Sequence, residues 1–265
     1  MEIIKSTKKL KRGGYQIKTE SGMVIRVSED SLVKHRLLKG QELSKSLLEQ
    51  IEREADFDIG YQKALAYLSY QLRSEKEIKD HLKKHEVSEE QIYLVIDKLR
   101  ELQLLNDAEF AKSYVRTAMR TTDKGPSGVK EFLFKKGIKQ EEIQEALSLF
   151  DEDSQYPLAL NLAEKNMRKN RQKSQQETKN KLNQFLYGKG FSSEVISRVI
   201  DEVITEVDED EEYEKLKAQG DKLWRRHERL EPYKRKQKIK QSLYQKGFSM
   251  DDINRYIDEK EMELD

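Results

Sequence analysis

The stretch Leu133-Phe-Lys-Lys-Gly137-Ile138-Lys-Gln-Glu-Glu-Ile143 carries a pattern that occurs four times in the chain and decides its fold. In each copy a leucine is followed by an apolar residue five positions later and by an isoleucine ten positions later. The leucines stand at 82, 133, 186 and 243, so the spacings are 51, 53 and 57 residues. Four copies in one register at nearly constant spacing are typical of a repeat protein.

Three copies place a glycine four positions after the leucine, at 137, 190 and 247. A helix ends most readily at a residue in the left-handed conformation, which glycine adopts without a side-chain penalty. Behind the apolar residue, Ser88 and Ser249 have the position and the hydroxyl to cap a following helix. Each copy therefore predicts a helix, a stop and a second helix.

The composition narrows the class of protein. Charged residues make up 38% of the 265 residues, apolar residues make up 35%, and there are three prolines, which favours a helical protein with small local cores. No stretch approaches the ~20 apolar residues of a membrane span, and the N-terminus lacks a signal-peptide layout. The chain has no cysteine, which excludes disulfides and thiol chemistry. We expect a cytoplasmic protein.

The first 57 residues differ from the rest, and we expect a cap with strands and a linker helix there. Apolar residues alternate or run together, with turn residues between them, which predicts two or three strands and a hairpin across residues 20–22. A short helix is expected over residues 30–37, and a linker helix over residues 44–55. The apolar runs that predict strands are at residues 3–4, 15–19 and 23–27.

The remaining chain is predicted to form four three-helix repeats. Ser74 and Glu77 form a capping-box pattern, and Gly125-Pro126 breaks the chain where a new helix begins. The second helix of the last two repeats is predicted to be about one turn longer. The predicted boundaries give repeats at residues 58–105, 106–152, 153–206 and 207–265.

Charge is segregated along the chain, although its net value is only +1. Residues 165–181 contain seven basic residues and one acidic residue, and residues 222–240 contain nine and two. Residues 201–214 contain nine acidic residues and no lysine or arginine, and residues 1–40 contain ten basic and four acidic residues. Such basic segments suggest nucleic acid or a nucleoprotein as partner, and a solvated helix face is the alternative for each.

The candidate binding residues are basic side chains in these segments and near the predicted helix ends. For Arg73 the alternative is a charge that stabilises a helix C-terminus. For the segment with Trp224 and Tyr233, phosphate binding with aromatic contacts competes with a buried tryptophan on a solvated helix. The candidates are Arg73, Arg116, Arg120, Lys124, Arg168, Lys169, Arg171, Lys173, Arg225, Arg226, Lys234, Arg235, Lys236 and Lys238.

An enzyme and a metal-binding protein are the alternatives to a nucleic-acid-binding protein. The chain has no phosphate-binding loop pattern, no dinucleotide-binding glycine pattern and no evident pair of catalytic carboxylates. His81 and His85 have the spacing of helical metal ligands, but no third ligand is evident. We therefore expect no catalytic residues, no cofactor and no metal.

Several stretches of the first two repeats resemble the RecX family, regulators of the bacterial recombinase RecA. They read Ala66-Tyr-Leu-Ser-Tyr-Gln-Leu-Arg-Ser-Glu75, Leu104-Leu-Asn-Asp-Ala-Glu-Phe-Ala-Lys-Ser-Tyr-Val-Arg-Thr117, Lys124-Gly-Pro126 and Lys136-Gly-Ile138. The last two repeats resemble the longer members from Gram-positive bacteria, mainly through Lys-Gly-Phe. Gln71 stands where the family often has a basic residue, and Phe132 where glutamate is common.

The resemblance implies a mainly α protein whose three-helix repeats form an elongated, curved array with a small N-terminal β cap. It further implies a monomer that lies in the groove of the RecA filament on single- or double-stranded DNA. Such proteins restrain filament extension, ATP hydrolysis, strand exchange and repressor cleavage, in DNA repair and control of the SOS response. A general single- or double-stranded DNA-binding helical repeat protein without a recombinase partner is the alternative.

Overall fold

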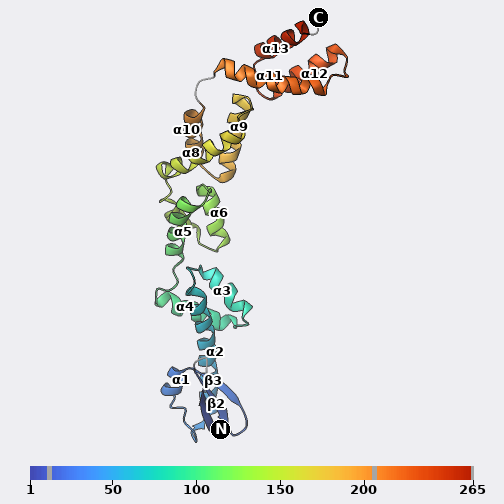
Figure 1. The fold of residues 1–265 in the computed structure, drawn as a ribbon. Helices are drawn as coiled ribbons and strands as arrows, with labels where there is room; N and C mark the ends of the chain where they lie inside the picture. Colours follow the sequence, from blue (N-terminus) through green and yellow to red (C-terminus); the bar gives the residue numbers. More distant parts are fainter. Residues whose placement is uncertain (11–13, 205–207, 264–265) are drawn as a thin grey trace. The chain divides into compact units, whose positions relative to one another are not determined.

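The computed structural model describes residues 1–10, 14–204 and 208–263 of the chain. These residues form a four-stranded sheet and thirteen helices (Figure 1), and they pack into two compact units. One unit is Met1–Ala111 with Phe134–Glu142, and the other is Lys112–Leu133 with Ile143–Asp265. Among the described residues, no helix combines the length and the apolar character that crossing a membrane requires.

The sheet is antiparallel, with the strand order β3-β2-β1-β4. Alternate residues point inward, so Ile17 on β2 and its partner Ile25 on β3 are both buried. Their core includes Leu37, Leu48 and Ile51 from the segments that follow. The strands are β1 (Glu2–Lys9), β2 (Tyr15–Thr19), β3 (Val24–Val27) and β4 (Glu42–Leu43).

The sheet has one strand more than the two or three predicted. The additional strand, β4, is two residues long and pairs Leu43 with Glu2. A strand this short has no alternating pattern, so the sequence carries no signal for it. The expected hairpin between β2 and β3 is confirmed by their antiparallel pairing, and the short helix is α1 (Glu29–Lys34).

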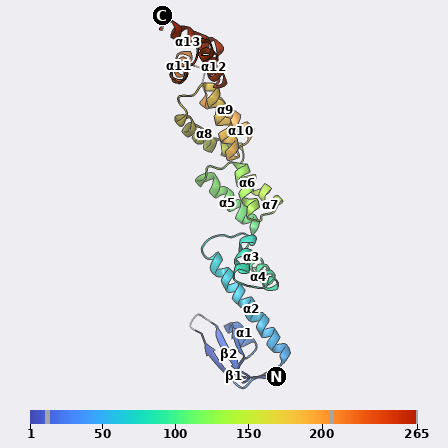
Figure 2. The ribbon, with the colours of Figure 1, turned by 90° about the vertical axis from the view of Figure 1, so that its right-hand side faces the viewer.

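The expected linker helix and the first helix of the first repeat are one helix, α2 (Lys45–Leu68). Figure 2 shows it running from the sheet to the helices α3 and α4. No residue between Ala55 and Asp58 breaks a helix. A Cβ on Gly60 would lie 3.3 Å from the side chains of Val87 and Val95, so the glycine lets these valines pack closely against α2. The predicted division at residue 57 therefore falls inside a continuous helix.

The rest of the described chain forms three-helix repeats, as predicted. The predicted length difference is confirmed too, because α9 and α12 have 15 and 14 residues whereas α3 and α6 have 10 each. The predicted boundary at 206–207 lies outside the described residues. The helices are α3 (Glu75–Lys84), α4 (Glu89–Glu101), α5 (Asp107–Thr121), α6 (Pro126–Lys135), α7 (Gln140–Leu147), α8 (Glu152–Lys169), α9 (Gln175–Lys189), α10 (Ser193–Val203), α11 (Glu209–Arg226), α12 (Pro232–Gln245) and α13 (Met250–Met262).

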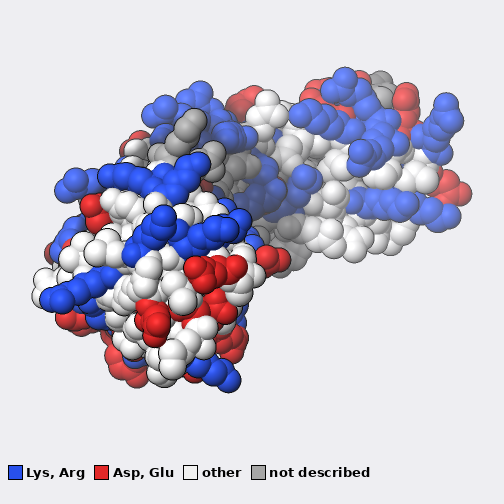
Figure 3. Space-filling view, turned by 90° about the horizontal axis from the view of Figure 1, so that it is seen from below, with Lys and Arg blue, Asp and Glu red and all other residues white. Residues whose placement is uncertain are grey.

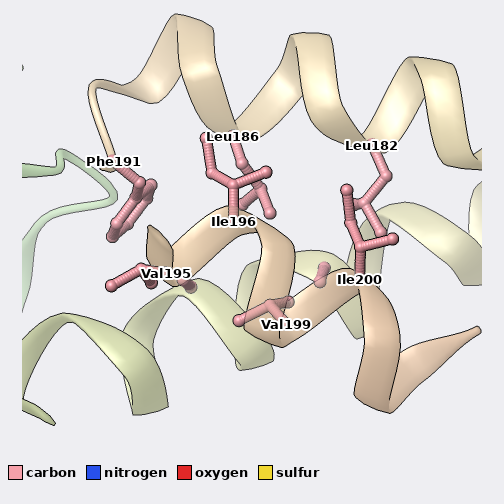
Figure 4. Close-up of a cluster of buried hydrophobic side chains, with 9 residues drawn as sticks. Leu182, Leu186, Phe191, Val195, Ile196, Val199 and Ile200 are labelled. Carbon is pink, nitrogen blue, oxygen red and sulfur yellow. The ribbon is translucent and has the colours of Figure 1, made fainter. Parts of the chain in front are cut away.

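The repeated pattern supplies the core of each repeat. In the third repeat Leu186 on α9, Phe191 after the stop and Ile196 on α10 are all buried, and Figure 4 shows them in one cluster. The equivalent residues of the fourth repeat, Leu243, Phe248 and Ile253, are buried in a cluster of their own. Burial of each such side chain contributes about 1.5–3 kcal/mol, which explains the strict register.

The glycine stops also form the contacts between consecutive repeats. In the first unit, Ser74 at the start of α3 donates a hydrogen bond from its hydroxyl to the carbonyl of Lys136, at 2.8 Å. In the second unit, the hydroxyl of Ser174 at the start of α9 donates in the same way to the carbonyl of Lys246. Each acceptor immediately precedes a glycine, so the start of one repeat's second helix rests on the stop of the next repeat.

An equivalent hydrogen bond links the second and third repeats, but its donor is different. Gly125 replaces the serine, and its own N–H donates to the carbonyl of Lys189 at 2.8 Å. The N–H of Ser127 donates to the carbonyl of Gly190 at 3.0 Å. A Cβ on Gly125 would lie 2.4 Å from the carbonyl carbon of Gly190, so the two backbones are in direct contact. The Gly-Pro turn predicted from sequence thus has a role in packing as well as in starting α6.

The first N–H of the second helix is satisfied from the following repeat. The N–H of Glu75 donates to a carboxylate oxygen of Asp107 at 2.8 Å, and the N–H of Gln175 donates to Glu212 at 2.8 Å. Burial raises the pKa of Asp107, and the hydrogen bond from Glu75 offsets this only in part. At this position the second repeat has Pro126, which has no N–H to satisfy.

Candidate functional site

The first group of candidate residues, Arg116, Arg120 and Lys124, lies at the end of α5 and in the turn before α6. Arg116 and Arg120 are four residues apart on the helix and both are exposed. The Lys124 ammonium lies 5.5 Å from the ring centre of Phe132. Lys124 is only partly exposed, and it follows the end of α5 by three residues. We refer to these three predicted residues as the α5 basic group.

An aromatic stack lies beside Lys124 of the α5 basic group. The rings of Tyr114 and Phe132 are parallel within 10°, with their centres 4.0 Å apart. Burial raises the pKa of the Tyr114 hydroxyl. Phe132 replaces a residue that is commonly glutamate in the resembling family, and here it holds Lys124 through its ring face rather than by a charge.

Arg73 is held inside the first unit. Its guanidinium stacks on the ring of Tyr67 at 4.0 Å and lies 3.7 Å from the carboxylate of Glu77. Its side chain is 16% exposed, so much of its charge is used by these two neighbours. The Tyr67 ring also stacks on the ring of His81, with the ring centres 4.0 Å apart. Burial lowers the pKa of His81. A binding role for Arg73 remains a prediction, and these contacts give it a structural role.

The basic residues near the end of α8 face acidic residues of the second unit. Arg168, Arg171 and Lys173 line a hollow of about 920 Å³ that Glu164, Glu202, Asp208, Glu211 and Glu212 line as well. Lys173 also lies 3.6 Å from Glu177, and Lys169 is exposed in the last turn of α8. The basic and acidic segments that are separate in sequence therefore share one hollow, which weakens its attraction for phosphate.

The basic segment of the fourth repeat divides into structural and exposed members. Arg235 stacks on Trp224 at 4.5 Å, and Trp224 is partly buried against the core of the repeat. Lys236 forms an ion pair with Glu261, and Lys234 lies 3.2 Å from Glu231. Among the candidate residues of this segment, Lys234 and Lys238 on α12 and Arg225 and Arg226 in the last turn of α11 are exposed.

The exposed basic side chains of these groups can attract a negatively charged partner. Figure 3 shows lysine and arginine side chains in several groups on the face that it presents, with acidic side chains between them. No cluster of His, Asp and Glu side chains suited to a metal ion occurs in the described part of the chain. His81 and His85 instead lie ring against ring, with centres 4.5 Å apart.

One set of exposed residues is aromatic, so the pattern of charges in the sequence does not indicate it. Phe134, Tyr187 and Tyr244 each follow the buried leucine of the repeated motif, and they are 69%, 73% and 61% exposed. Their equivalent in the first repeat is Lys83. The sequence holds the signal, since an aromatic recurs at one motif position, but helical periodicity alone does not show which residues face solvent.

The fold defines a class, proteins of tandem three-helix repeats with a small N-terminal sheet, whose candidate sites are exposed basic and aromatic side chains. Comparison with known protein families matches all four repeats to the domains of one family. Residues 61–99 match the first three-helix domain of RecX, residues 106–147 match the second, and residues 153–200 and 209–257 both match the third. The chain belongs to the RecX family.

Named relatives and solved structures agree with this assignment. The chain is 46% identical to the regulatory protein RecX of Enterococcus faecalis, over 95% of this chain and 94% of that one. A crystal structure of regulatory protein RecX has a TM-score of 0.67 and 35% identity, covering 76% of this chain and all of that one. A structure of RecX from Lactobacillus salivarius has a TM-score of 0.54 and 43% identity, covering 56% and 96%.

Proposed function

We propose that the protein regulates RecA by binding the RecA filament on DNA and restraining its extension, ATP hydrolysis, strand exchange and repressor cleavage. Membership of the RecX family carries this proposal, because every predicted repeat matches a RecX domain and the relatives are named regulatory proteins. The protein would act without catalytic residues of its own, as a binding protein in the cytoplasm.

The α5 basic group is the proposed filament contact. Arg116 and Arg120 are exposed one turn apart on α5, and the partly exposed Lys124 lies beside the stacked rings of Tyr114 and Phe132. Complementary charge across an interface speeds association and orients the partners. Arg168, Arg171 and Lys173 are weaker candidates because carboxylates line the same hollow.

The test measures ATP hydrolysis by RecA filaments that are assembled on DNA before the protein is added. Wild-type protein should reduce the rate at amounts well below one molecule per RecA protomer. Changing Arg116, Arg120 and Lys124 to glutamate should raise the amount needed for half-inhibition about tenfold or more, because three reversed charges turn attraction into repulsion. Circular dichroism verifies that the variant remains helical.

A matched control reverses three exposed basic residues elsewhere. Lys45, Arg53 and Lys84 are exposed on α2 and α3 and lie outside every candidate group. Their change to glutamate alters the net charge by the same amount, so it should leave inhibition nearly unchanged. Equal loss in both triple variants would show a general effect of charge and would contradict the proposed contact.

The alternative, a general DNA-binding protein without a recombinase partner, rests on the exposed basic residues of the fourth repeat, Lys238, Arg225 and Arg226. A competitor for DNA must cover the lattice, so it should act only at amounts that coat the DNA and only when it is added before RecA. That outcome would replace the proposed function with the alternative.

A further inference from the structure

The second helix of the third repeat presents a stripe of amide and tyrosine side chains to solvent. Gln176, Asn180, Asn183 and Tyr187 follow one another at helical spacing on α9, and all four are exposed. The amide of Gln176 donates to the side-chain oxygen of Asn180 at 3.1 Å. The buried face of the same helix carries Leu182 and Leu186 instead, so this stripe is not needed for the core.

The second helix of the fourth repeat repeats the arrangement. Tyr233, Gln237, Gln241 and Tyr244 also follow one another at helical spacing on α12, and all four are exposed. The amide of Gln237 donates to the hydroxyl of Tyr233 at 3.0 Å. Between the two tyrosines the sequence has five lysines and arginines and no aspartate or glutamate.

The two stripes meet within the second unit. Tyr244 lines a hollow of about 380 Å³ together with Gln176, Asn180 and Lys246, and Glu177 lies on its wall. A smaller hollow of about 140 Å³ lies beside Tyr187, where Lys179, Asn183 and Asp201 contribute to the lining. Tyr187 and Tyr244 thus each line a depression that offers hydrogen-bonding groups.

We propose that Tyr187, Tyr244 and the amides between them form a binding surface for the unpaired bases of single-stranded DNA. Bases stack on aromatic rings and hydrogen-bond to amide side chains through their edges. Only an unpaired strand exposes both the faces and the edges of its bases to a protein surface. On α12 the exposed Lys238 stands between the two tyrosines in sequence and supplies positive charge for the backbone.

The chemistry of the stripes favours nucleic acid over a protein partner. The centre of a protein interface is apolar and has few charged residues, whereas these stripes have amides between the aromatic rings and no aliphatic side chain. The inference deepens the proposed function, on which its DNA partner rests, and it assigns the base contacts to residues outside the basic groups.

The test compares two labelled oligonucleotides of equal length in fluorescence anisotropy, oligothymidine and a strand of the same sugar-phosphate backbone without bases. Changing Tyr187 and Tyr244 to leucine keeps apolar bulk and removes the stacking faces. We expect about a tenfold or greater loss of affinity for oligothymidine, little change for the abasic strand and an unchanged salt dependence. The double change to phenylalanine should restore binding of oligothymidine.

Tyr93 on α4 provides the matched control, because it is 60% exposed and lies on a different helix of another repeat. Tyr93→Leu should bind both strands like the wild type. Wild-type affinity of the double leucine variant for oligothymidine, or equal losses on both strands, would overturn the proposal. So would a variant that keeps its affinity for oligothymidine but no longer inhibits preassembled RecA filaments, since the stripe would then contact protein.

Failure of the proposed function is a separate result. If the wild type leaves RecA unaffected, the anisotropy comparison still decides whether the tyrosines contact bases.

Discussion

The second helix of every repeat ends at a residue in the left-handed conformation, but the first repeat uses a different residue type from the other three. Glu86 ends α3 with φ of 59°, in the left-handed region, while Gly137, Gly190 and Gly247 have φ of 83°, 89° and 88°. Glu86 is exposed. At each of the three glycines a Cβ would lie within 2.8 Å of an atom from the preceding repeat.

The hydrogen bond to the carbonyl just before each stop shows the same difference between the first repeat and the others. In the second, third and fourth repeats it accepts a hydrogen bond from the residue that starts the preceding repeat's second helix. In the first repeat the carbonyl of His85 accepts instead from the ammonium of Lys63 on α2, at 3.1 Å. In the described chain the first repeat follows the sheet and α1 rather than another three-helix repeat. Helix termination alone therefore tolerates glutamate, and contact between repeats is what requires glycine.

The largest effect is expected from Gly190→Ala. The substitution places a Cβ 2.5 Å from the backbone nitrogen of Gly128 and in a backbone conformation that alanine avoids. We expect a loss of about 2–4 kcal/mol in the free energy of unfolding, from strain and overpacking together. Denaturant unfolding followed by circular dichroism measures it.

Gly188→Ala is the control for that change, because Gly188 lies inside α9, two residues before the stop. A Cβ at Gly188 meets nothing within 4 Å, so alanine should stabilise the helix by about 0.5–1 kcal/mol. If both substitutions had the same effect, the close contact between the second and third repeats would not be what restricts position 190.

A smaller effect is expected at the serine that links two repeats. Ser74→Ala removes a helix cap and the hydrogen bond to Lys136, which should cost about 2 kcal/mol. Ser249→Ala removes a cap that has no such link to another repeat and should cost about 1 kcal/mol. Thermal unfolding of both variants gives the difference, and equal losses would mean that the contact between repeats adds no stability.

The smallest effect is expected at the first stop. Glu86→Gly relieves a left-handed glutamate without removing a buried contact, so stability should rise by up to about 1 kcal/mol. A loss of stability at this position would show that the glutamate side chain has a contact of its own and would break the comparison between the stops.

Much of the fold was readable from the sequence because it depends on local periodicity. The repeated leucine, apolar residue and isoleucine predicted the helix pairs, and Ser74 with Glu77 predicted a capping box that the structure contains. β4 and the continuity of α2 were missed, since two residues carry no period and a boundary without a helix breaker carries no signal. Membership of the RecX family, expected from motifs in the first two repeats, is confirmed across all four.

For the candidate site, the sequence determined which residues carry charge, and the tertiary structure decided which of them remain available. Arg235 and Arg73 are equally basic in sequence, yet one stacks on Trp224 and the other on Tyr67. The sequence alone set the helices, their stops and their caps, because these follow from interactions within a few residues. The structure alone decided that the stops form the contacts between repeats and that Tyr187 and Tyr244 face solvent, because both depend on residues far apart in the chain.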